Sequence, residues 1–206
     1  MAELEKPIEA KGAEIKLLKR VQVYDKDGNL IEDTGLQESH SWMQNFLKLL
    51  GTSLSDRTVA YNITRYDGVS DSLAIKTNWD VEGYWMSIYG GTVDYRGIVV
   101  GSGNLAEDYT QYTLETRITD GSAAGQLEYG TQAWEVPEVT GGNVDFRLSR
   151  SFQNNSGGTV TIREIAIFVD VDNSVHTMIA RDVLSSEVAV PNGGLAIATY
   201  TLRTTV

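Results

Sequence analysis

The two histidines, His40 and His176, are the side chains best suited to transfer protons near neutral pH. Because cysteine is absent, a transition-metal site or a nucleophilic catalyst would need histidines, hydroxyls and carboxylates gathered from distant parts of the chain. The chain has no H-x-x-x-H pair and no G-x-S-x-G elbow. We therefore predict that it is not an enzyme, and we assign no catalytic or metal-binding residue. The competing hypothesis is a pocket that joins His40 or His176 to carboxylates.

Residues 101–106, Gly-Ser-Gly-Asn-Leu-Ala, fit the G-x-G-x-x-A pattern of dinucleotide sites. In such sites the turn opens a helix, so that the pyrophosphate meets the helix N-terminus. Here Glu107 and Asp108 follow, and their charge would oppose a phosphate. Tyr109, Thr110 and Tyr112 then disfavour a helix. We predict a glycine-rich loop and no nucleotide or other cofactor.

Two predicted turns carry oxygen ligands of the kind found in calcium loops: Asp25, Asp27 and Asn29 in one, and Asp170, Asp172 and Asn173 in the other. Neither turn keeps the spacing D-x-[DN]-x-[DN]-G with a glutamate six residues after the glycine. We interpret both as hairpin turns in which Asp and Asn bind backbone groups. Cation binding at one of them is the alternative.

The aromatic residues indicate surfaces that bind other molecules. Tyr84, Trp85 and Tyr89 belong to a tyrosine- and tryptophan-rich stretch that suits either a sugar platform or a protein interface. Trp42 and Phe46 lie one helical turn apart and suit packing against a sheet or anchoring a partner. We take all five as interface candidates, with carbohydrate binding as the alternative.

Composition limits the classes of partner. The 206 residues include 28 acidic and 17 basic ones, which gives a formal net charge of −11. This charge repels nucleic acid, whose binding depends on Lys and Arg at the phosphates. Lys16, Lys19 and Arg20 lie close together, and we interpret them as a solvated strand face. We expect no direct binding to nucleic acid.

The start of the chain is polar and acidic, without a basic region followed by an apolar one, so we expect no signal peptide. Nor does any apolar run approach the ~18 residues that span a bilayer. We therefore expect no membrane partner. Residues 1–12 show no periodicity and are expected to form an arm, with a single domain over residues 13–206.

The helix that would carry Trp42 and Phe46 is the one clear helix that the sequence indicates. Trp42, Phe46, Leu49 and Leu50 recur at i, i+4, i+7 and i+8, which predicts a short amphipathic helix near residues 39–50. Gly51 is expected to end it.

Most of the remaining chain indicates strands. Glycine is abundant (20 residues) and proline scarce (3), while Tyr, Thr and Val suit pleated strands. We expect strands at 14–24, 96–100, 114–118, 125–129, 132–136, 143–153, 159–169, 175–180 and 195–205. Residues 58–91 are hard to assign. Many strands, few helices and close turns predict a mainly β protein, an antiparallel β-sandwich, with a jelly roll as one possible arrangement.

Two passages resemble structural proteins of tailed bacteriophages. The first combines residues 97–103, an apolar strand with a glycine loop, with residues 112–118, Tyr-Thr-Leu-Glu-Thr-Arg-Ile. The second combines residues 152–158, 162–168, 178–184, 188–194 and 200–206. Together they cover roughly the C-terminal half, and they are strand-and-turn patterns without a catalytic signature.

This resemblance implies a virion component: a capsid, decoration, neck or tail protein. We therefore expect a virion protein made in the host cytoplasm, whose partners are copies of itself and other virion proteins. Arg181 and Asp182 lie inside the second passage and are expected to form an ion pair, either locally at the end of a strand or between subunits. The alternative function is a carbohydrate- or receptor-binding module.

Overall fold

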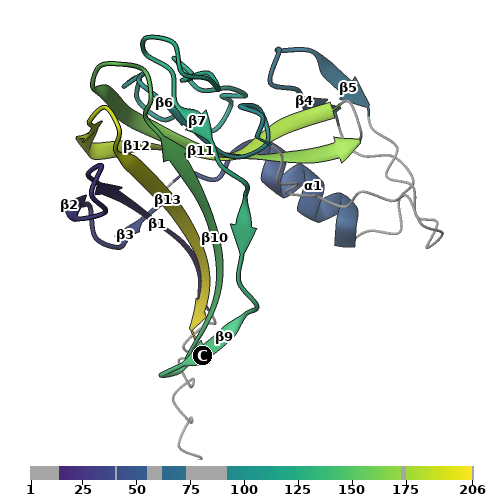
Figure 1. Ribbon diagram of the computed structural model, residues 1–206. Helices are drawn as coiled ribbons and strands as arrows, with labels where there is room; N and C mark the ends of the chain where they lie inside the picture. Colours follow the sequence, from purple (N-terminus) through teal and green to yellow (C-terminus); the bar gives the residue numbers. More distant parts are fainter. Residues whose placement is uncertain (1–13, 40, 55–61, 73–91, 173–174, 206) are drawn as a thin grey trace, which may run out of the picture.

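The structure, a computed structural model, describes residues 14–39, 41–54, 62–72, 92–172 and 175–205. Within these residues two antiparallel sheets pack against each other, and a helix lies beside one of them (Figure 1). The predicted mainly β sandwich is therefore confirmed. The predicted arm, residues 1–12, lies outside the described residues, as do His40, Tyr84, Trp85 and Tyr89.

The large sheet is built around three strands of eleven residues: β1 (Glu14–Tyr24), β13 (Leu195–Thr205) and β10 (Asn143–Gln153). β13 lies in the middle and pairs with the other two along its whole length. Shorter strands lie along the outer edges: β2 (Leu30–Asp33) and β3 (Gln37–Glu38) beside β1, and β7 (Glu128–Tyr129), β8 (Ala133–Trp134) and β9 (Glu138–Thr140) beside β10.

The second sheet has the order β12 (Val175–Val190), β11 (Val160–Asp172) and β6 (Gly97–Gly101). All five residues of β6 are buried, as is nearly all of β11 beyond Glu164. Such unbroken burial arises because both faces of this sheet are covered. One face packs on the large sheet and segment 102–118 lies against the other, while α1 (Gln44–Leu54) packs beside β12, where Asn45 Nδ2 donates to Thr177 Oγ1 (2.6 Å). A small hairpin of β4 (Asn62–Thr64) and β5 (Ser70–Ser72) adjoins the helix.

The helix occupies Gln44–Leu54 and not residues 39–50. It begins late because residues 41–43 pair with β12: Met43 N donates to Ile179 O (2.9 Å) and Arg181 N to Ser41 O (3.2 Å). Gly51 does not end the helix, because the chain stays helical through Leu54. Trp42 and Phe46 lie half-buried against the core, which agrees with packing against a sheet, the first of the two roles considered for them.

The strand predicted at 114–118 is wrong, and that at 125–129 is reduced to β7. Residues 102–127 form bends and turns, with isolated bridges such as Gly101 to Arg117. Two backbone hydrogen bonds tie residues 116–118 to β6 and Ser102, and other backbone groups of this segment bind side chains: Thr116 N donates to the Glu164 carboxylate (2.9 Å), and the Tyr129 hydroxyl donates to Ile118 O (2.6 Å). An apolar pattern does not reveal such partners.

Candidate assembly surface

A fully buried ion pair lies on the face of the second sheet that segment 102–118 covers. Arg181 on β12 donates to Glu164 on the neighbouring β11, with 2.9 Å from Nε to Oε2. The remaining guanidinium nitrogens donate to Gln111 Oε1 (2.8 Å) and Leu105 O (3.0 Å). Because every charged group here has partners, the pair avoids the penalty of an unpaired buried charge. Arg181 therefore fixes segment 102–118 on the sheet.

The glycine-rich loop surrounds the same Glu164 carboxylate. Gly103 N and Thr116 N donate to Oε1 (3.2 and 2.9 Å), and Glu115 N donates to Oε2 (3.2 Å). A Cβ atom at Gly101 would lie 2.5 Å from Oε1, so the backbone approaches closely only because glycine has no side chain. The N–H groups that a dinucleotide site would offer to phosphate bind a carboxylate of the protein itself.

Asp182 lies on the opposite face of β12, as alternation along a strand requires. Its carboxylate accepts hydrogen bonds from Lys19 Nζ, Ser39 Oγ and Tyr200 Oη, each at 2.8 Å. Burial, reinforced by the Asp182 charge, raises the pKa of the Tyr200 hydroxyl well above its usual value. This network joins β12 to β1 and β13, and so binds the two sheets together.

The expected ion pair between Arg181 and Asp182 is wrong, because neighbouring residues of a strand point to opposite faces. Both side chains are fully buried and have their partners within the chain. They stabilise the sandwich and expose no charged group for a second subunit.

His176 is buried on β12 and hydrogen-bonds Asp170 through Nδ1. Arg96 Nε lies 3.3 Å from the same carboxylate, and the Tyr95 ring centroid lies 4.9 Å from that of His176. A His–Asp pair also occurs in catalytic triads, which require a nucleophilic hydroxyl as well. None is hydrogen-bonded to His176 within the described residues.

The predicted turn at 25–29 is confirmed and explains its acidic residues. Gly28 has φ of 83°, and the Asp25 carboxylate accepts from Asp27 N and Asn29 N, each at 2.9 Å. Its hydrogen bonds with Asn29 hold the pKa of Asp25 below its usual value. Asp25 thus closes the turn. In the other turn Asp170 binds His176, while Asn173 lies outside the described residues.

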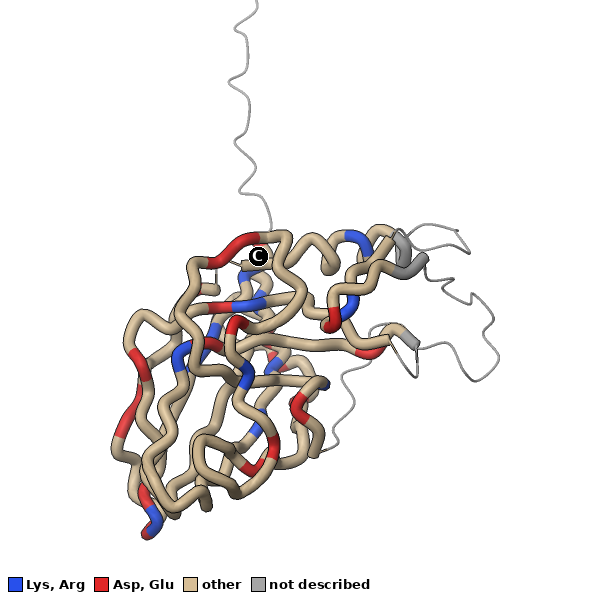
Figure 2. The backbone as a smooth tube through the Cα atoms, turned by 90° about the horizontal axis from the view of Figure 1, so that it is seen from above, with Lys and Arg blue, Asp and Glu red and all other residues tan. Residues whose placement is uncertain are grey.

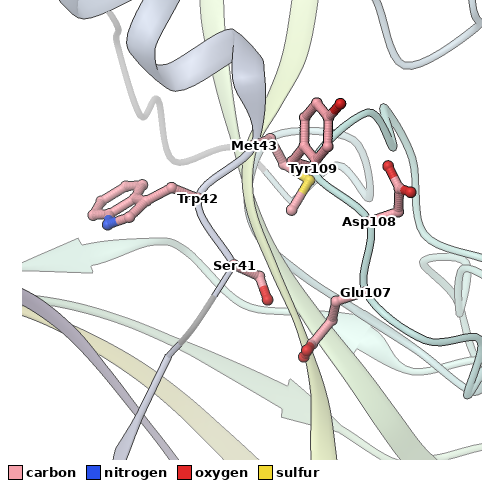
Figure 3. A pocket seen from close by; sticks show the side chains of 6 residues that line it. All are labelled: Ser41, Trp42, Met43, Glu107, Asp108 and Tyr109. Carbon is pink, nitrogen blue, oxygen red and sulfur yellow. The ribbon is translucent and has the colours of Figure 1, made fainter.

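A small pocket of about 180 Å³ lies where residues 41–43 meet residues 107–109 (Figure 3). Its lining consists of Ser41, Trp42, Met43, Glu107, Asp108 and Tyr109. Trp42 and Tyr109 point to opposite sides of it, and Trp42 stacks on Phe46 with centroids 3.9 Å apart. Glu107 accepts from Val183 N (2.7 Å) and Asp108 from Thr110 N (2.8 Å). Both carboxylates therefore already have partners.

The far end of the large sheet extends beyond the second sheet (Figure 1). Its inner face there carries mostly apolar side chains. Ile15, Thr204, Val144 and Val139 lie directly opposite one another across β1, β13, β10 and β9. Exposure rises toward the two edges of this row, to 65% at Ile15 and 74% at Val139. Next to β9, Trp134 is 61% and Val136 84% exposed. We call Ile15, Val139, Trp134 and Val136 the apolar end.

The outer face of the same strands is charged. Arg203 forms a bidentate pair with Asp145, with both N–O distances at 2.7 Å, and these hydrogen bonds hold the pKa of Asp145 below its usual value. On β1, Arg20 pairs with Asp33 and holds the pKa of that carboxyl at about 2. Figure 2 shows acidic and basic positions interspersed along the described backbone. At this end of the sheet, the outer face is therefore charged and the inner face is apolar.

Sequence patterns did not reveal the buried charge of Glu164 or the apolar end. Lys19, expected on a solvated strand face, is buried and binds Asp182. The signal for the apolar end was present: Trp134 and Val136 alternate with Glu135, and Val139 follows Glu138. Such alternation indicates a strand with one apolar face. What the sequence does not reveal is that the second sheet stops short of that face.

No protein-family model, curated protein or solved structure matches the chain. Within the described residues, no helix is long and apolar enough to span a membrane. The same part of the chain contains no group of three or more His, Asp or Glu side chains placed to hold a metal ion.

Proposed function

We propose that the chain is a structural component of the virion of a tailed virus and works by protein–protein assembly rather than by catalysis. Its partners are copies of itself and other virion proteins, and its location is the capsid, neck or tail. The observation that carries this proposal is the apolar end of the large sheet, which no described residue covers.

An apolar sheet face exposed to water costs free energy, about 25 cal/mol for each Å². Isolated apolar side chains are common on surfaces, but here Trp134, Val136 and Val139 follow one another along one edge of the sheet, and Ile15 lies at the opposite edge, in the same row as Val139. Contact with another protein would remove that area from water. A structural subunit uses such a surface, whereas a protein that acts as a monomer gains nothing from it.

The resemblance to phage structural proteins supports the same proposal. Its passages fall on β6, β11, β12 and β13, and on the loop around Glu164. These elements form the sandwich and its buried ion pairs. A fold joined by buried ion pairs in this way is rigid, and rigidity suits a structural subunit.

The test is the mass of the purified protein by light scattering over a range of concentrations, with electron microscopy of the same samples. We expect assemblies of uniform subunits, such as rings, tubes or shells, whose symmetry would separate capsid from tail. A protein that stays monomeric at high concentration would contradict self-assembly.

A glycan- or receptor-binding module is the second candidate, and the pocket beside Trp42 favours it. Tyr109 is 67% exposed at its rim, and sugars pack on open aromatic rings. Saturable binding on a glycan array that is lost in Tyr109→Ala and kept in Tyr112→Ala would favour this function. No binding to the array would leave assembly as the proposal.

A further inference from the structure

A lysine and an aspartate lie in contact inside the sandwich, between the two sheets. Lys19 comes from β1 and Asp182 from β12, and Lys19 Nζ lies 2.8 Å from Asp182 Oδ1. The Asp182 side chain is fully buried, and that of Lys19 is 7% exposed. The two residues are 163 positions apart in the sequence, so the fold alone brings them together. The contact therefore holds an amine against a carboxyl group, away from solvent.

Such a pair can react as well as attract. A lysine amine is a nucleophile once it has lost a proton, and a carboxyl group accepts a nucleophile once it has gained one. Burial disfavours both charged forms. Transfer of one proton from Nζ to Oδ1, along the hydrogen bond that joins them, gives the two neutral groups that react.

Two hydroxyl groups hold the second oxygen of the same carboxyl group. Ser39 Oγ and Tyr200 Oη each donate to Asp182 Oδ2 at 2.8 Å. Tyr200 lies directly opposite Lys19 on the neighbouring β13, and Ser39 N donates to Leu17 O on β1 (2.8 Å). When an amine attacks a carboxyl carbon, negative charge develops on the oxygen that stays, and donors directed at that oxygen stabilise the transition state. The two hydroxyl groups are placed as an oxyanion hole.

From this geometry we propose that Lys19 and Asp182 condense into an amide, an isopeptide bond that joins β1 to β12. Nζ forms a bond with Cγ, the Cγ–Oδ1 bond breaks, and Oδ1 leaves as water with two of the three ammonium protons. One ammonium and one carboxylate become one amide and one water, so no oxidant, cofactor or further reactant is required. The reaction takes place once in each chain and does not depend on the proposed assembly function.

Fixed proximity replaces the activation that amide formation requires in solution. Well-oriented groups held together by a fold react as if present at about 10⁵–10⁸ M. Lys16 also lies close to a carboxylate, that of Glu38, but their side chains are 32% and 51% exposed. Water stabilises both ions there, so we expect no bond at that pair.

The bond links the two sheets covalently in a chain that has no cysteine. It closes a loop that spans 163 sequence positions, which restricts the unfolded chain as a disulfide does. We therefore expect the linked protein to resist unfolding more strongly than the same chain without the bond.

The test is the mass of the purified, denatured protein, followed by a tryptic peptide map. We expect a mass below that of the sequence by about 18 Da, the mass of one water. Because trypsin does not cleave after an acylated lysine, residues 17–20 should appear joined to the peptide that contains Asp182. A folded protein with the full mass and two separate peptides would overturn the proposal.

The peptide map is necessary because Asp–Gly sequences, such as Asp27-Gly28, can also lose water by closing on their own backbone. Water loss located at those sequences alone would likewise overturn the proposal. The contact between Lys16 and Glu38 is an internal control, and the map should show cleavage after Lys16.

Lys19→Arg is the matched variant, because it keeps a positive charge beside Asp182 but cannot form the bond. It is expected to have the full mass of its own sequence and to unfold at a lower temperature than the linked protein. Loss of water from the Asp182 peptide in this variant would show that Lys19 is not the nucleophile and would overturn the proposal.

Two further variants test the hydroxyl groups. Tyr200→Phe and Ser39→Ala each remove one donor and should slow bond formation about 100-fold or more, measured by mass at successive times after the start of expression. Tyr129→Phe is the control, because it loses another buried hydroxyl, which donates to Ile118 O and not to Asp182. Circular dichroism identifies the variants that fold. If folded variants at all three positions link as fast as the original, the two hydroxyl groups are not an oxyanion hole and that part of the proposal is overturned.

Discussion

The Arg203–Asp145 pair contributes stability that depends on pH. Because Arg203 lowers the pKa of Asp145 in the folded protein, the pair stabilises the fold above the ordinary aspartate pKa and loses this contribution as pH falls. Arg203→Met should lower the free energy of unfolding at pH 7 by about 1 kcal/mol, since Arg147 still lies 3.3 Å from Asp145. Urea unfolding at pH 7 and pH 3 measures the difference, which should shrink at pH 3.

Arg163→Met is the control for this prediction, because its partner Glu187 is largely exposed. Such a pair contributes about 0–1 kcal/mol. A loss in Arg203→Met that stays the same at pH 3 would show that the side chain acts through packing and not through the charge of Asp145.

Charged residues inside the sandwich show why sequence neighbours are poor guides to contacts. Arg181 and Asp182 adjoin in the sequence, yet one binds Glu164 on one face of β12 and the other binds Lys19 on the opposite face. Their partners lie 17 and 163 residues away, on strands whose order the sequence does not specify. Alternation correctly predicts the opposite directions, but the partners follow from the strand order alone.

At the scale of elements, the loop around Glu164 depends on its glycines. In Gly101→Ala the new Cβ would lie 2.7 Å from Thr116 O and 2.5 Å from Glu164 Oε1, so the loop must move and strain its hydrogen bonds. We expect a loss of about 1–3 kcal/mol in the free energy of unfolding. Gly158→Ala is the control, because no atom lies within 4 Å of its Cβ position. Equal stabilities of the two variants in urea unfolding would contradict this account.

The helix gives a prediction of the opposite sign. Gly51 lies inside α1 with open space around its Cβ position, so Gly51→Ala should raise the free energy of unfolding by about 0.5–1 kcal/mol. Gly28→Ala should lower it, because Gly28 has φ of 83° in the turn before β2. Thermal unfolding of both variants measures the difference. A less stable Gly51→Ala protein would mean that this glycine has another role.

The sequence predicted best those strands that bury one face. Residues 14–24, 143–153 and 195–205 match β1, β10 and β13, because polar and apolar residues alternate along them and turn residues bound them. β12 was predicted to end at residue 180 but continues to Val190, since its charged residues Arg181 and Asp182 are buried in partnerships that composition does not reveal. The helix start was wrong because tertiary pairing of Met43 with Ile179 overrides local propensity.

At the scale of the whole molecule, the large sheet is longer than the second sheet that packs on it. The buried ion pairs and the core hold the second sheet over one end of the large sheet, and the far end extends past it (Figure 1). A net charge of −11 makes copies repel each other at long range. The proposed association must therefore come from short-range apolar contact, and the apolar end offers such a surface.

This argument predicts that polar residues in the apolar end separate assembly from folding. Trp134→Gln/Val136→Gln should leave the free energy of unfolding within about 1 kcal/mol of the original, because both side chains are mostly exposed. The same change should shift assembly to higher protein concentration, since less apolar area would be removed from water at each contact. Light scattering against concentration measures that shift. Leu47→Gln is the control, because Leu47 is 65% exposed on α1 and not on the large sheet, and the change should not affect assembly. If the double variant and the Leu47 variant assemble alike, the apolar end does not drive association and the contact surface must lie elsewhere.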